Sequence, residues 1–116
     1  MFYGNQTEIL NEMYRYSDLM QNIVTVKDMD NLSNSMAKQL EETAVNSLNP
    51  FVLHSISHNL CSKILVLAMD NFIFPDSTYY LLSLMFDRNM VLPVYQSKLS
   101  TLLSKKIAER SGKLKP

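Results

Sequence analysis

The sequence has 116 residues, of which 47% are hydrophobic and 19% charged, and its 11 basic and 11 acidic residues leave no formal net charge. This length and composition exclude a disordered chain and predict a single helical domain over residues 1–116, with a frayed tail at 111–116. The two glycines, Gly4 and Gly112, lie near the ends, which excludes internal glycine loops for phosphates or dinucleotides and disfavours a sheet with tight turns.

Hydrophobic residues recur every three or four positions in five segments, which predicts an all-α bundle of four to five antiparallel helices. The first segment spans residues 7–24, with Asn5 as its expected N-cap. The second spans residues 32–48, with Asp28 or Asp30 as its expected N-cap. It ends where a proline follows, because the residue before a proline avoids the α region.

The third segment, residues 50–71, has the widest hydrophobic surface, and we therefore expect it to be the central helix. The fourth spans residues 77–88, with Asp76 as its expected N-cap. The fifth spans residues 93–110 and begins with a proline, which suits the first turn of a helix. Gly112 follows it at the position of a C-terminal cap.

The cysteine content and the apolar runs bear on location. Cys61 is the single cysteine, so no disulfide forms within the chain, and a reducing compartment fits best. The first residues carry neither the basic leader nor the apolar run of a secretory signal. The longest uninterrupted apolar stretch, residues 64–69, is much shorter than the roughly 20 residues that span a bilayer. We therefore expect a cytoplasmic protein without a membrane span.

His54, His58 and Cys61 form the sharpest group of metal-ligand residue types. They fall on one face of the expected third helix, and imidazole and thiolate are ligands of zinc. A complete site requires another ligand, such as Asp70 or a residue of a second chain. Because the chain has no second cysteine and no third histidine, the sequence favours the alternative, in which Cys61 packs as a small hydrophobic residue. No metal or cofactor is therefore predicted.

Charge is distributed unevenly along the chain. Residues 98–116 contain six basic residues and one acid, whereas residues 1–97 contain five basic and ten acidic residues. A basic end can contact nucleic acid, an anionic membrane or an acidic partner. The favoured alternative is a solvated helix face whose cations stabilise the helix C-terminus. The candidate basic surface consists of Lys98, Lys105, Lys106, Arg110 and Lys113.

Five aromatic residues gather near the expected break between the third and fourth helices, namely Phe72, Phe74, Tyr79, Tyr80 and Phe86. Aromatic side chains are enriched at protein-binding surfaces. The sequence supports equally the alternative that these rings close the end of the bundle. Met85 and Met90 are candidates for an adaptable exposed groove beside them, whereas the helical spacing of Met13, Met20 and Met36 fits a core.

The leading hypothesis is a non-enzymatic protein-interaction module, such as an adaptor, chaperone, inhibitor or immunity-type factor, that binds through an exposed aromatic and methionine surface. Its expected partner is another protein, in a hetero- or homo-oligomer. No serine stands in a glycine-flanked elbow and no carboxylates converge by spacing, so no catalytic residues are predicted.

Two alternatives remain open. The first is a small nucleic-acid-binding regulator that uses the basic C-terminal helix. One form of it is a helix-turn-helix made by residues 77–88 and 93–110, with Gln96, Ser97 and Lys98 near the bases. The connector lacks the usual turn glycine, which disfavours this alternative. The second is a metal-binding helical protein.

Overall fold

The computed structural model of the chain describes residues 6–42 and 50–110. Within these ranges every regular element is a helix, and no strand is present. The helices are α1 (Gln6–Gln21), α2 (Val26–Glu42), α3 (Pro50–Met69), α4 (Asp76–Asp87) and α5 (Pro93–Arg110). The predicted all-α bundle is thereby confirmed. The expected caps Asn5 and Gly112 and the tail at 111–116 lie outside the described residues.

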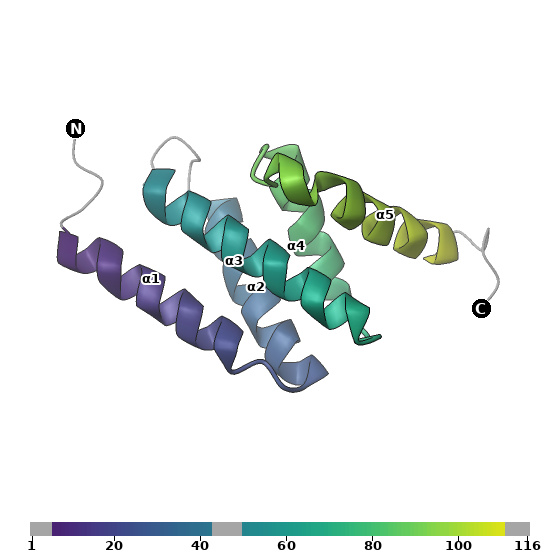
Figure 1. The fold of residues 1–116 in the computed structure, drawn as a ribbon, viewed down its shortest axis with the longest axis horizontal. Helices are drawn as coiled ribbons and strands as arrows, with labels where there is room; N and C mark the ends of the chain where they lie inside the picture. Colours follow the sequence, from purple (N-terminus) through teal and green to yellow (C-terminus); the bar gives the residue numbers. More distant parts are fainter. Residues whose placement is uncertain (1–5, 43–49, 111–116) are drawn as a thin grey trace.

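The helices are arranged in two layers (Figure 1). α1, α3 and α5 form the front layer, and α2 and α4 lie behind it. α3 occupies the middle of the front layer and contacts α1 on one side and α5 on the other, as its wide hydrophobic surface predicted. The most extensive packing joins α2 to α4, so the two rear helices meet although α3 separates them in the sequence.

A reciprocal capping box sets the start of α2, which begins at Val26 and not at residue 32 as its hydrophobic pattern suggested. The backbone N–H groups of Val24 and Thr25 each donate to the Asp28 carboxylate at 2.9 Å, and the N–H of Asp28 donates to Thr25 Oγ1 at 3.1 Å. Thr25 is therefore the N-cap, and the prediction of Asp28 or Asp30 as the N-cap is wrong. The two backbone hydrogen bonds lower the pKa of the Asp28 carboxyl below its usual value.

Asparagine takes the place of glycine at the ends of α3 and α4. Asn71 and Asn89 have φ angles of 60° and 56°, in the left-handed region. The N–H of Phe72 donates to the carbonyl of Leu67, and the N–H of Met90 donates to the carbonyl that lies five residues earlier. Both ends are therefore Schellman motifs, in which asparagine tolerates the left-handed backbone better than most residues. The scarcity of glycine thus coexists with sharp helix ends.

The core is continuous, and every described helix contributes buried side chains to it. The contribution of α5 is a single buried residue, Leu99. The largest fully buried apolar side chains are Met29, Leu60, Ile64, Leu81, Leu82, Met85 and Leu99. Met20 and Met36 are buried as predicted, whereas the exposed groove expected around Met85 and Met90 is wrong, because both side chains are buried. None of the described helices is long and apolar enough to cross a membrane.

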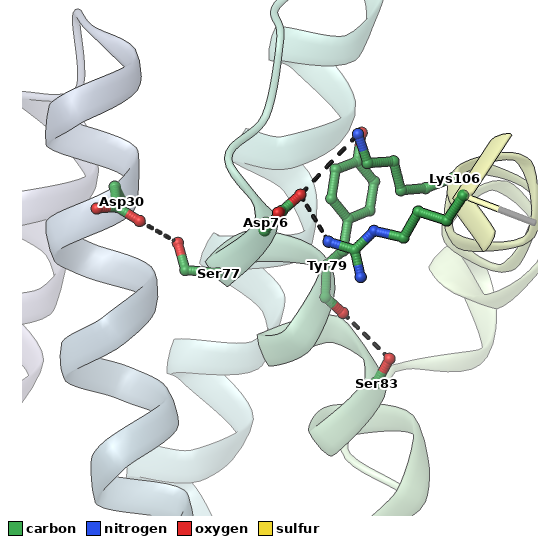
Figure 2. Close-up of polar contacts among 7 residues, drawn as sticks. Asp30, Asp76, Ser77, Tyr79, Ser83 and Lys106 are labelled. Carbon is green, nitrogen blue, oxygen red and sulfur yellow. Dashed lines mark hydrogen bonds and ion pairs between the residues drawn. The ribbon is translucent and has the colours of Figure 1, made fainter.

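Polar bonds lie between the rear helices α2 and α4. The hydroxyls of Ser33 and Thr78, both fully buried, are 2.8 Å apart. Ser77 Oγ donates to Asp30 Oδ1 at 2.6 Å, a bond that Figure 2 shows at the start of α4. Because a buried hydroxyl without a partner is costly, these bonds favour one register of α2 against α4.

Candidate functional site

A shallow groove lies where the connection between α3 and α4 meets α5, and we call it the aromatic–basic groove. It has a volume of about 320 Å³. Its apolar lining consists of Ala68, Phe72, Ile73, Phe74, Tyr79 and Leu102. Its polar lining consists of Asn71, Lys105, Lys106 and Glu109. The groove therefore joins apolar side chains from three chain segments to the basic half of α5.

Three aromatic rings run from the core to the surface at this groove. The ring centroids of Phe72 and Phe74 are 5.2 Å apart, and the ring of Tyr79 meets that of Phe74 edge-on at 6.2 Å. Phe74 is only 4% exposed, whereas Phe72 and Tyr79 are partly buried. Tilted and edge-to-face contacts are favourable for aromatic rings, so Phe74 fixes the two outer rings from below.

Asp76 links α4 to α5 at one side of the groove (Figure 2). Its Oδ1 is 2.7 Å from Nη2 of Arg110 and 4.0 Å from Nζ of Lys106. The same Lys106 ammonium lies 5.3 Å from the centroid of the Tyr79 ring, within the range of a cation–π contact. Burial raises the pKa of the Tyr79 hydroxyl, and the negative charges of Glu109 and Asp76 raise it further.

The predicted capping role of Asp76 is wrong. α4 begins one residue earlier than predicted, so that Pro75 is the N-cap and makes no side-chain capping bond. Asp76 instead lies in the first turn, where a negative charge complements the helix dipole. Its carboxylate is directed to the cations of α5, as Figure 2 shows.

The structure brings together parts of two surfaces that the sequence treated separately. Phe72, Phe74 and Tyr79 come from the aromatic group, and Lys105 and Lys106 come from the basic group. Arg110 adjoins them through Asp76, and Lys113 lies outside the described residues. Lys98 is exposed on α5 but is not part of the groove lining.

Ile73 is the groove residue that sequence reasoning missed. It is 79% exposed although it lies between two aromatic residues that are largely covered. The left-handed conformation of Asn71 turns the chain at the end of α3, and residue 73 then falls outside the helical pattern. The only available signal was a large aliphatic residue in a helix break, where periodicity no longer predicts burial.

Tyr80 and Phe86 lie away from the groove. Tyr80 is 50% exposed, and a hydrogen bond with the Glu41 side chain at the end of α2 raises the pKa of its hydroxyl. Phe86 lines a different depression at the start of α5, together with Val91 and Gln96. The five aromatic residues therefore do not form one surface.

The three residues considered as candidate metal ligands, for which the sequence favoured the alternative, do not share one environment. Cys61 is fully buried, and burial raises the pKa of its thiol to about 11. His58 is exposed, and its Nδ1 is 3.0 Å from the hydroxyl of Tyr95. The side chain of His54 lies outside the described side chains. Among the side chains that are described, no three His, Cys, Asp or Glu residues are grouped so that they could hold a metal ion.

The connector between α4 and α5 contains a left-handed turn residue, although it lacks the turn glycine whose absence disfavoured the helix-turn-helix hypothesis. Asn89 supplies the left-handed turn position that a glycine usually fills. Gln96, Ser97 and Lys98 are exposed, although the Gln96 amide donates to the carbonyl of Val91 at 3.0 Å.

Chemically, the aromatic–basic groove can cover an apolar side chain with Phe72 and Tyr79 and can pair a carboxylate with the cations of α5. Comparisons of the chain with protein-family models, with curated proteins and with solved structures gave no match.

Proposed function

We propose that the protein is a non-enzymatic interaction module whose protein partner packs against the aromatic–basic groove. The observation that carries this proposal is an exposed aliphatic side chain, Ile73, next to the partly covered rings of Phe72 and Tyr79. Covering such side chains with a partner removes apolar surface from water, and aromatic residues held in place bring contact area at a small entropic cost. Phe74 supports this surface from the core and is not itself a contact residue.

The chemistry of the reactive residues also supports binding over catalysis. The Cys61 thiol is buried and has a raised pKa, which disfavours the nucleophilic thiolate at neutral pH. Lys106 of the groove and the adjacent Arg110, both on α5, are paired with Asp76 of α4. Cations paired with a carboxylate in this way are suited to contact the surface of a partner protein.

Site-specific photocross-linking in the source cell tests the proposal. A photoreactive amino acid replaces Ile73 in one variant and Val94 in a control variant. Val94 is also a strongly exposed aliphatic residue, but it lies at the start of α5, outside the groove. We expect a defined protein adduct from position 73 that is absent from position 94.

A second substitution makes the result specific. Tyr79→Ala should reduce the adduct from position 73 several-fold, and the purified partner should bind the variant correspondingly more weakly in vitro. Circular dichroism checks that the variant keeps its helices. An equal adduct from positions 73 and 94, or none from position 73, contradicts the proposed binding surface.

A second candidate function, nucleic-acid binding by α4 and α5, is favoured by the left-handed turn at Asn89 and by the exposed Lys98 and Lys105. Binding to phosphates releases counterions, so the affinity for a DNA or RNA duplex should fall steeply with rising salt. Lys98→Gln should reduce this affinity, whereas Lys63→Gln on α3 should not. An absence of affinity at low salt excludes this candidate.

A further inference from the structure

The carboxylate of Asp76 occupies the position beside the groove where a ligand carboxylate could contact the cations of α5. It pairs with Arg110 and lies near Lys106, which also covers the Tyr79 ring. The Asp76 side chain is 74% exposed and that of Arg110 is 55% exposed. Exposed ion pairs contribute little to stability because water and salt screen them. Another carboxylate can therefore replace Asp76 at small cost to the fold.

The charges around the groove favour an acidic occupant once Asp76 is displaced. Lys105, Lys106 and Arg110 then face the occupant, with Glu109 as the acidic residue of the lining. Lys105 is exposed and forms no ion pair with any part of the chain that the structure describes. These cations stand directly beside apolar side chains, so that charge and apolar contact are available to a single ligand segment.

We propose that the groove takes an acidic amphipathic segment of the partner protein and that Asp76 is an internal competitor for it. An apolar side chain of the segment packs on Phe72 and Ile73, and a carboxylate of the segment replaces Asp76 on Lys106 and Arg110. This inference rests on the proposed function and names the chemistry of the partner.

A synthetic peptide tests the inference directly. The probe is a fluorescein-labelled helical peptide with Phe and Leu on one face and Glu beside them, and the matched peptide has Gln at every Glu. Fluorescence anisotropy measures binding to the full chain and to the variants Asp76→Asn and Arg110→Gln. Two control variants remove the same charges elsewhere, namely Asp87→Asn at the end of α4 and Lys63→Gln on α3.

The acidic peptide should bind the wild-type chain more tightly than its Gln counterpart. Asp76→Asn should tighten this binding by about two- to fivefold, the range expected for release of an exposed ion pair, and Arg110→Gln should weaken it to a similar degree. Each change must exceed that of its control, which reports the effect of net charge alone. Circular dichroism confirms that each variant is folded.

The other outcomes separate this inference from the proposed function. Equal binding of both peptides, with no effect of Asp76→Asn, overturns the acidic partner and leaves an apolar docking surface in place. Absence of binding by both peptides also overturns the inference, while the cross-linking at position 73 still decides the proposed function. Displacement of the acidic peptide by a DNA duplex with a steep dependence on salt assigns the cations to nucleic acid and overturns the inference as well.

Discussion

The interface between α2 and α4 and the contact between α4 and α5 differ in the forces that hold them. α4 buries Thr78, Leu81, Leu82 and Met85, and its contact with α2 contains a hydrogen bond between two fully buried hydroxyls. α5 buries Leu99 alone, and its second half meets α4 through exposed charges and the Tyr79 ring. The comparison distinguishes a scaffold held by buried side chains from an exposed face whose contacts we propose to be exchangeable, and the candidate binding groove lies on that exchangeable face.

The largest expected effect comes from truncating the scaffold. Leu82→Ala removes a fully buried side chain of α4 and should lower the free energy of unfolding by about 2–5 kcal/mol, since the cavity it leaves collapses only partly. Ile107→Ala on α5 removes a side chain that is more than half exposed and should change the free energy of unfolding by less than about 0.5 kcal/mol. Urea unfolding measures both. Similar losses for the two variants would contradict the division into scaffold and exchangeable face.

The buried hydroxyl pair should give the next effect. Ser33→Ala leaves the Thr78 hydroxyl buried without this partner and should lower the free energy of unfolding by about 1–3 kcal/mol. Thr78→Val should lower it by a similar amount, because it leaves the Ser33 hydroxyl without this partner. The double variant should lose less than the sum of the two single losses, because neither hydroxyl is then left unpaired. A double-mutant cycle in urea measures this coupling. Strict additivity would show that the pair does not fix α2 against α4.

The joint between α4 and α5 should give a smaller effect. Asn89→Ala removes the short polar side chain that makes the left-handed region at φ 56° tolerable. It should lower the free energy of unfolding by about 1 kcal/mol. Asn89→Gly should be at least as stable as the wild type. Asn34→Ala, the same change at an exposed position inside α2, is the matched control and should not destabilise. Thermal unfolding compares the three variants.

The smallest effect on stability is expected at Asp76. Asp76→Asn removes its exposed ion pairs and should change the free energy of unfolding by less than about 1 kcal/mol, with a difference that shrinks as salt is added. Unfolding at low and high salt measures it. A loss as large as that of Leu82→Ala would make Asp76 a structural anchor and contradict its role as an exchangeable competitor.

Much of the fold could be predicted from local patterns. The helical period of the hydrophobic residues in the segment 32–48 predicted a helix with one apolar face, and Leu32, Met36 and Leu40 of this segment are buried. Pro93 predicted the start of α5, which begins there. The start of α2 was predicted too late because the Thr25–Asp28 capping box precedes the hydrophobic stripe and depends on side-chain hydrogen bonds, which a hydrophobic period does not reveal.

The candidate site was predictable only in part. The sequence named Phe72, Tyr79 and Lys106 but assigned them to two different surfaces, because residues far apart in a chain show no sign of their contact in a helical period. It also treated Phe74 as equal to its neighbours, although Phe74 is buried beneath them. The turn at Asn71 decides which residue of the connection points outwards, and this turn is set by the end of α3 and not by hydrophobicity.

The sequence by itself determined where the helices form, apart from the start of α2, and which face of each helix is apolar, because a period near 3.6 residues and the backbone preferences of proline are properties of the local chain. The tertiary structure alone decided that α2 packs on α4, that Met85 and Met90 are buried, and that the aromatic and basic residues share one groove. Those outcomes depend on how the helices cross, which side-chain packing fixes between segments distant in the chain.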